Sequence, residues 1–103
     1  MKISSAIKQA ITIIEGTFGS ETGGGNKVEI VSEMYRLEPD EHAPAGRLGC
    51  DILITPNIEG CESVKVFFPN YLAEEIAWNP MGQLVANEFV WETCKSVVQP
   101  FMD

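Results

Sequence analysis

Apolar and polar residues follow a helical period at the start of the chain. Apolar residues recur at three- and four-residue steps from Ile3 to Ile14, and polar residues fall between them. Ser4 or Ser5 is a suitable N-cap, and Gly16 can take the left-handed conformation that often ends a helix. The pattern predicts one amphipathic helix.

The middle of the chain has the two-residue period of strands. A first segment, Lys27–Leu37, is rich in Val, Ile and Tyr, and its alternation slips at Ile30–Val31, which is typical of a bulge. Two more regular segments follow, joined by turn residues at Pro56–Gly60. We expect three antiparallel strands. The inward-facing positions of the second and third strands are Leu48, Cys50, Ile52 and Ile54, and Val64, Val66 and Phe68.

The expected hairpin also bears on the cysteines. A loop at Asn57–Gly60 would place Cys50 opposite Phe67, too far from Cys61 for a disulfide. With Cys94 the cysteines are odd in number and lack CxxC spacing, which indicates neither a disulfide framework nor a zinc site. We expect reduced, partly buried thiols.

Two helices are predicted near the C-terminus. Asn70 can cap a short helix that ends at Trp78, and Asn79–Gly82 fits a type I turn. A longer helix from Gln83 to about Gln99 has apolar residues on two sides, and both sides must be buried. Either the short helix covers the second side, or the chain self-associates as a homodimer. The residues of that expected oligomer interface are Leu84, Val85 and Phe89.

Together these elements predict one α+β domain over residues 1–103. Its N-terminal helix precedes a three-stranded antiparallel sheet, and two C-terminal helices pack on one sheet face. The connection at residues 19–26 is rich in glycine, and we expect it to be flexible. It follows a helix and lacks the Lys and Ser or Thr of a phosphate-binding loop.

No apolar run approaches the ~20 residues of a membrane span. Lys8 and Gln9 interrupt what would be the core of a secretory signal. These features favour a cytoplasmic location.

Acidic residues dominate the charge of the chain. Fifteen acidic and seven basic residues give a formal net charge of −8. Binding to nucleic acid or to an anionic membrane depends on clustered Lys and Arg, so neither is expected. Ten of the acidic residues lie between Glu29 and Glu75, against three basic ones. This concentration favours a basic protein partner.

Residues with catalytic potential are few. His42 is the single histidine, and it lies beside acidic residues that would disfavour the thiolate of a nearby cysteine. Glu38, Asp40 and Glu41 offer oxygen ligands, but they lack EF-hand spacing. We therefore expect no enzyme activity, no metal and no cofactor.

A small acidic protein-binding module fits these observations best. We expect an inhibitor or chaperone that engages a basic, nucleic-acid-binding surface of a partner, a profile of size and charge that phage-encoded inhibitors share. The alternative is an assembly subunit that self-associates through its C-terminal helix. Phe67 points away from its apolar neighbours, so it is the expected exposed aromatic. The full set of expected partner-binding residues is Glu38, Asp40, Glu41, Glu59, Glu62, Phe67, Glu74 and Glu75.

Overall fold

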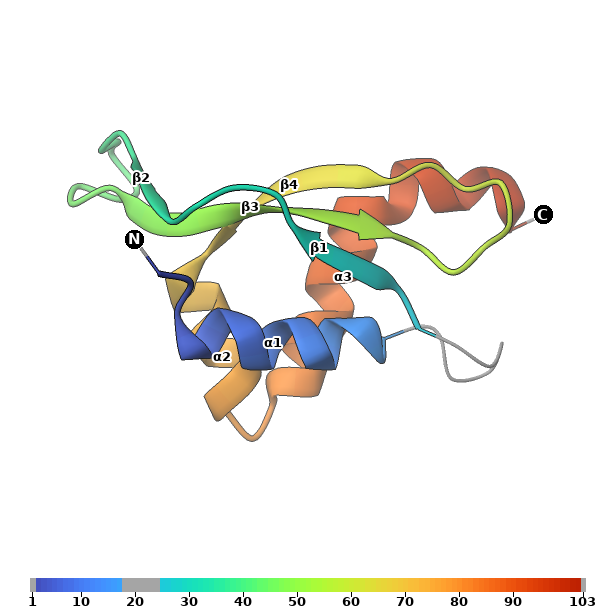
Figure 1. Cartoon of the computed structure of the whole chain (residues 1–103), viewed down its shortest axis with the longest axis horizontal. Helices are drawn as coiled ribbons and strands as arrows, with labels where there is room; N and C mark the ends of the chain where they lie inside the picture. Colours follow the sequence, from blue (N-terminus) through green and yellow to red (C-terminus); the bar gives the residue numbers. More distant parts are fainter. Residues whose placement is uncertain (1, 18–24, 103) are drawn as a thin grey trace.

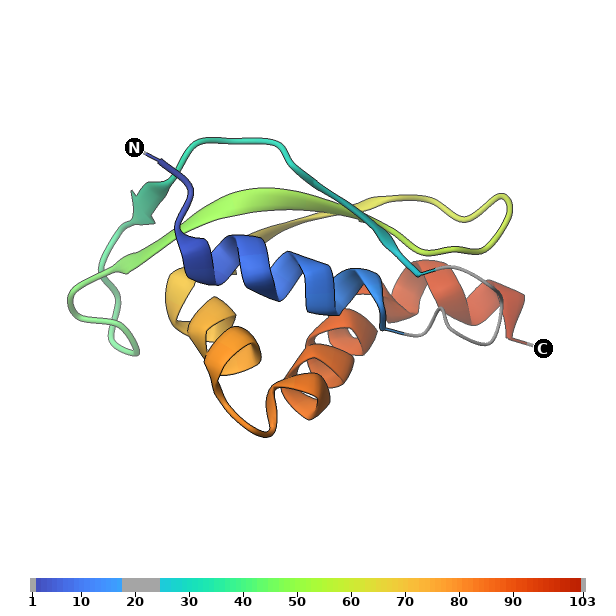
Figure 2. The same ribbon diagram turned by 60° about the horizontal axis from the view of Figure 1, so that its bottom comes forward.

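A helix, an antiparallel sheet and two further helices follow one another along the chain (Figure 1). The computed structural model describes residues 2–17 and 25–102. The helices pack against one face of the sheet (Figure 2), which confirms the predicted α+β fold. The elements are α1 (Ser5–Glu15), β1 (Lys27–Ile30), β2 (Tyr35–Leu37), β3 (Arg47–Thr55), β4 (Val64–Pro69), α2 (Asn70–Trp78), α3 (Gly82–Val98) and the 3-10 turn η2 (Gln99–Phe101).

The sheet has four strands where the sequence predicts three, because the first expected strand is interrupted. Both β1 and β2 pair with β3, on the side opposite β4. Ile30 lies opposite Ile52, and Tyr35 lies opposite Gly49. Between these two pairs the edge segment has four residues, 31–34, whereas β3 has two, 50 and 51. The interruption covers residues 31–34, so it begins at the predicted slip at Ile30–Val31.

The β3–β4 hairpin is one residue out of the predicted register. Cys50 lies opposite Phe68, not opposite Phe67. Residues directly opposite each other share a face of the sheet, and Cys50 and Phe68 both point into the core. Burial of both apolar faces therefore selects the observed register, and the loop is longer than the expected four-residue turn.

The core lies between the sheet and the three helices. As predicted, α1 is amphipathic, and Ser4 is its N-cap, with its hydroxyl accepting a hydrogen bond from the Ile7 amide. The largest core side chains come from every layer: Ile7, Ile14, Ile52, Ile54, Phe68, Ile76 and Val90. Burial of these groups is the main source of the stability of the fold.

The C-terminal end of α1 differs from the prediction. Gly16 has φ −85°, which is right-handed, so it does not end the helix in the left-handed form. The Asn26 side chain instead donates hydrogen bonds to the carbonyls of Ile14 and Thr17, at 3.1 and 2.7 Å. Asn26 belongs to the predicted flexible connection, yet it is buried. Residues 18–24 of that connection lie outside the described residues.

The start of α2 also differs from the prediction. Asn70 is the first residue of α2, and Pro69 occupies the cap position. The Asn70 side chain donates to Glu74 and accepts from the Ser4 hydroxyl, so it ties α2 to the start of α1. The turn that follows α2 is confirmed by a hydrogen bond of 2.9 Å from the Gly82 amide to the Asn79 carbonyl.

The two-sided apolar pattern of α3 is explained by packing within the chain. Phe89 stacks on Phe68 with ring centroids 5.2 Å apart, and Val85 also packs against the core. Both residues are only partly buried, so the expected oligomer interface stays a prediction. Leu84, the third residue of that expected interface, is 58% exposed.

Candidate functional site

No helix or strand of the described chain covers the face of the sheet that points away from the helices (Figure 2). Along β3 the buried residues Cys50, Ile52 and Ile54 alternate with residues that are only half-buried. The latter, Asp51 and Leu53, therefore point outward, together with Phe67 of β4. We call this surface the outer face.

Two aromatic rings and a carboxylate meet at the middle of the outer face. The rings of Tyr35 and Phe67 pack edge to face, with centroids 5.3 Å apart and an interplanar angle of 61°. The Tyr35 hydroxyl donates a hydrogen bond of 2.5 Å to Asp51 Oδ1. We call these three residues, Tyr35, Asp51 and Phe67, the aromatic centre. Edge-to-face packing of this kind is a favourable arrangement of aromatic pairs.

The interruption of the edge strand positions Tyr35. The Ser32 hydroxyl accepts a hydrogen bond of 2.8 Å from the Asp51 amide, and the Val31 amide donates to the Asp51 carbonyl at 3.0 Å. Two backbone groups of Asp51 are thus satisfied within the interruption. Pairing then resumes at Tyr35, two residues out of step with β1, which brings its ring beside Phe67.

The absence of a side chain at Gly49 leaves space for the Phe67 ring. A Cβ at this position would lie 2.8 Å from Phe67 Cζ and 2.3 Å from the Phe68 carbonyl oxygen. Both distances are below ordinary van der Waals contact. A side chain at Gly49 would therefore force the aromatic centre and the β4 backbone to move.

Contact with Asp51 raises the pKa of Tyr35. The hydrogen bond to the Asp51 carboxylate is the largest cause that raises the pKa of Tyr35 above 10.0, and desolvation and the negative charge of Asp51 add to it. A phenolate beside a carboxylate is unfavourable. At neutral pH the aromatic centre therefore presents a protonated phenol that donates to a carboxylate.

The predicted partner-binding acids do not form one patch. Glu38, Asp40 and Glu41 precede β3 in the β2–β3 loop, whereas Glu59 and Glu62 follow it in the β3–β4 loop (Figure 1). A strand rises about 3.3 Å per residue, so the nine residues of β3 hold these loops roughly 26 Å apart. Phe67, predicted to be an exposed aromatic, is half-buried on the outer face between them.

The two acids of α2 also separate from the rest. Glu74 lines a cleft of about 400 Å³ together with His42, Arg47 and Tyr71. Because His42 belongs to the β2–β3 loop, Glu74 lies near that loop. Glu75 is exposed and is not among the residues that line this cleft. The acidic region read from the sequence is therefore distributed around the molecule.

Asp40 has a structural role in the β2–β3 loop. Its carboxylate accepts hydrogen bonds of 2.8 Å from the amides of His42 and Ala43, and it pairs with Arg47 at 3.0 Å. The Ala43 and His42 amides are the main cause that lowers the pKa of Asp40 below 3.8. Asp40 therefore shapes the loop, on which Glu38 is exposed.

The cysteines lie away from the outer face and are free thiols. Burial raises the pKa of Cys50, Cys61 and Cys94, and the pKa of Cys94 reaches about 11.

In the described ranges, no group of three His, Cys, Asp or Glu side chains is placed to hold a metal ion. None of the helices described is long and apolar enough to cross a membrane.

Comparison of the chain with family models, curated proteins and solved structures found no match. Function is therefore inferred from the residues of the site.

Of the aromatic centre, the sequence predicted Phe67 but not Tyr35 or Asp51. A carboxylate that interrupts the apolar run of a central strand, as Asp51 does between Cys50 and Ile52, was the available signal for the outer face.

Proposed function

We propose that this chain is a small protein-binding module, an inhibitor or chaperone, that engages a basic surface of its partner through the outer face. The observation that carries the proposal is the aromatic centre itself. Tyr35 and Phe67 pack beside the carboxylate of Asp51 on a sheet face that no described element covers. Aromatic side chains with a polar group nearby are typical of the energetic centres of protein interfaces.

An arginine of the partner fits the aromatic centre. A guanidinium group can stack against an aromatic ring and donate hydrogen bonds to a carboxylate at the same time. The Tyr35 hydroxyl occupies Asp51 Oδ1, which leaves Oδ2 as the acceptor for such a donor. Tyr35 is 37% exposed, so it offers a surface on which the guanidinium packs.

Acidic groups at both ends of the sheet support a basic partner. Glu38 lies in the loop before β3, and Glu59 and Glu62 lie in the loop after it, all three exposed. Negative charge at separate points steers a positively charged surface toward one orientation and raises its association rate. The partner surface would thus carry a central arginine and basic groups toward its ends.

An assembly subunit is the second candidate, and one observation favours it. Three large apolar side chains at the corner between α2 and α3 are more than half exposed: Trp78 (57%), Met81 (56%) and Leu84 (58%). Exposed apolar groups that lie close together mark association surfaces. A dimer through this corner would leave the outer face accessible.

The test is affinity capture from a lysate of the organism that encodes the chain, with quantitative mass spectrometry. The baits are the wild-type chain, Asp51→Lys and Tyr35→Ser, with Leu84→Ser as a control at the α2–α3 corner. We expect a basic protein that wild type and Leu84→Ser retain, that the two outer-face variants lose, and that 0.5 M salt releases. About 0.5 M salt shortens the screening length to a few ångströms.

Two outcomes would contradict the proposal. One is a captured set without a basic protein; the other is unchanged capture by both outer-face variants. Circular dichroism and thermal unfolding of each bait establish that loss of binding is not loss of fold. Loss of capture in Leu84→Ser, together with a concentration-dependent mass in light scattering, would favour the assembly subunit instead.

A further inference from the structure

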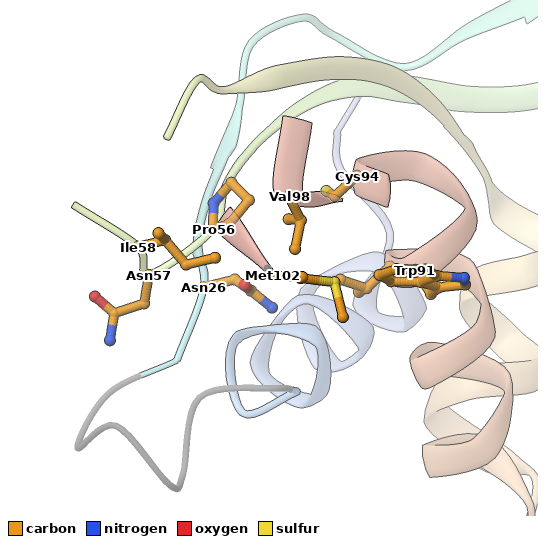
Figure 3. A pocket seen from close by; sticks show the side chains of 9 residues that line it. Asn26, Pro56, Asn57, Ile58, Trp91, Cys94, Val98 and Met102 are labelled. Atoms are coloured by element: carbon orange, nitrogen blue, oxygen red, sulfur yellow. The ribbon is translucent and has the colours of Figure 1, made fainter. Parts of the chain in front are cut away.

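An apolar pocket of about 540 Å³ lies between the C-terminal helix and the connection that follows β3 (Figure 3). It is separate from the outer face, and none of its lining residues belongs to the aromatic centre. Pro56 and Ile58 form one side, and Trp91 of α3 lies on the other (Figure 3). Val98 and Met102 complete much of the apolar lining.

We propose that this pocket binds a small, uncharged, aromatic ligand. Its volume lies within the roughly 300–1,000 Å³ of known small-molecule sites. An apolar cavity of roughly 150 Å³ already holds benzene, so this pocket has room for a molecule of two or three rings. The Trp91 indole offers a flat surface for such a ring, and the flexible side chain of Met102 adapts to its outline.

The lining explains why the ligand is uncharged. The residues that line the pocket include no Asp, Glu, Lys, Arg or His. An ion moved from water into such a site would lose hydration without gaining a counter-charge. A net charge of −8 further disfavours an anion.

Three lining residues carry a polar amide or a thiol, Asn26, Asn57 and Cys94, and they do not change this inference. Asn57 is exposed, so it does not place a buried polar group in the pocket. The Asn26 amide group already donates to the carbonyls of Ile14 and Thr17. Burial holds the pKa of Cys94 at about 11, so its thiol is neutral at physiological pH and behaves as a small apolar group. The pocket therefore selects its ligand by shape and apolar contact.

The experiment uses N-phenyl-1-naphthylamine, a neutral aromatic dye whose emission rises in apolar surroundings. It is done in a Trp78→Phe background, so that Trp91 is the remaining tryptophan and energy transfer from it reports a dye bound to the chain. We expect saturable binding of one dye per chain, with energy transfer from Trp91 and a higher temperature of unfolding.

Two matched pairs of variants locate the site. Val98→Phe fills the pocket, whereas Val31→Phe makes the same change at an exposed residue of the edge segment. Met102→Lys places a charge at the pocket, whereas Met81→Lys does so at the α2–α3 corner. Both pocket variants should raise Kd about tenfold or more, since a filled or charged pocket no longer accepts the ring.

The control variants should bind the dye as the background protein does. Met102 is 62% exposed, so Met102→Lys tests the site even where Val98→Phe fails to fold. Non-saturable binding, several dyes per chain, or unchanged Kd in the pocket variants that fold would overturn the proposal. An equal loss of affinity in Met81→Lys and Met102→Lys would overturn it as well.

Discussion

Tyr35 donates a hydrogen bond to Asp51 across the sheet, with 2.5 Å between Tyr35 Oη and Asp51 Oδ1. The two residues are not directly opposite each other, because Tyr35 pairs with Gly49 and Asp51 pairs with Phe67. The phenol therefore reaches diagonally from its own pairing position, opposite Gly49, to Asp51. One hydrogen bond thus links the edge strand to the central strand at the centre of the outer face.

Removal of the Asp51 carboxylate should change the titration of Tyr35. The pKa of Tyr35 is raised chiefly by its hydrogen bond to Asp51, so Asp51→Ala should return that pKa toward 10.0. Phenol ionisation is followed by absorbance near 295 nm, and Tyr35→Phe identifies the component that belongs to Tyr35. Titration of the Asp51→Ala protein along the wild-type curve would show that the contact is absent in solution.

The same contact makes stability depend on pH in the alkaline range. A group whose pKa is higher in the folded state contributes stability below its unfolded pKa and loses it as pH rises through the folded value. The contribution of Tyr35 is therefore complete below pH 10.0 and declines above it. Tyr71 is 56% exposed and serves as the control, since Tyr71→Phe should leave this decline in place.

A side chain at Gly49 should destabilise the protein. The Cβ of Gly49→Ala would meet the Phe68 carbonyl oxygen at 2.3 Å as well as the Phe67 ring, and we expect a loss of about 1–3 kcal/mol in urea unfolding. Because the closer contact is with backbone, Phe67→Ala should not rescue it. Gly60→Ala is the comparison: Gly60 has φ +82° and open space around it, so its cost of about 1–2 kcal/mol comes from conformation alone. Full rescue by Phe67→Ala would contradict the backbone clash.

Patterns of short range in the sequence predicted much of the fold. The period of α1 and the alternation along β3 and β4 reflect burial of one face of each element, and each is visible within about ten residues. The hairpin register was wrong because a four-residue turn was assumed. Matching the inward face of Cys50 to that of Phe68 would have selected the observed pairing.

Features that depend on contacts between residues far apart in the sequence could not be predicted from local patterns. The end of α1 is completed by Asn26, which lies 12 residues beyond the carbonyl of Ile14 in sequence. The separation of Glu38 from Glu59 depends on the length and direction of β3, not on their spacing along the chain. Similarly, the aromatic centre requires the interruption before Tyr35, which the alternation indicated only as an irregularity.

Truncation of neighbouring residues on β3 should have unequal effects. Ile52 is fully buried on the helix side, whereas Leu53 is half-buried on the outer face. Ile52→Ala should cost about 2–5 kcal/mol of unfolding free energy, because it leaves a cavity in the core. Leu53→Ala should cost about 1 kcal/mol or less, since its surroundings are partly solvent. Equal losses in urea unfolding would mean that the outer face is covered in solution.

Asn26 and Asn79 provide a pair of substitutions with opposite expected signs. The Asn26 amide donates to two carbonyls at the C-terminal end of α1, whereas Asn79 Oδ1 accepts from the Met81 amide at the start of α3. Asn26→Asp removes the donors and places negative charge where the helix is already negative, so it should cost more than the roughly 1–3 kcal/mol of Asn26→Ala. Asn79→Asp keeps the acceptor at a helix N-terminus and should be neutral or stabilising.

The pH dependence of the two aspartate variants separates charge from packing. At position 26 the folded state disfavours the carboxylate, so the pKa of the introduced group rises, and the loss of stability should shrink as pH falls from 7 to 4. At position 79 the folded state favours the carboxylate, so any gain should be present at pH 7 and decline toward pH 4. Urea unfolding of both variants and wild type at the two pH values measures this. A loss in Asn26→Asp that is the same at both pH values would show that the missing donors, and not the charge, account for the whole effect.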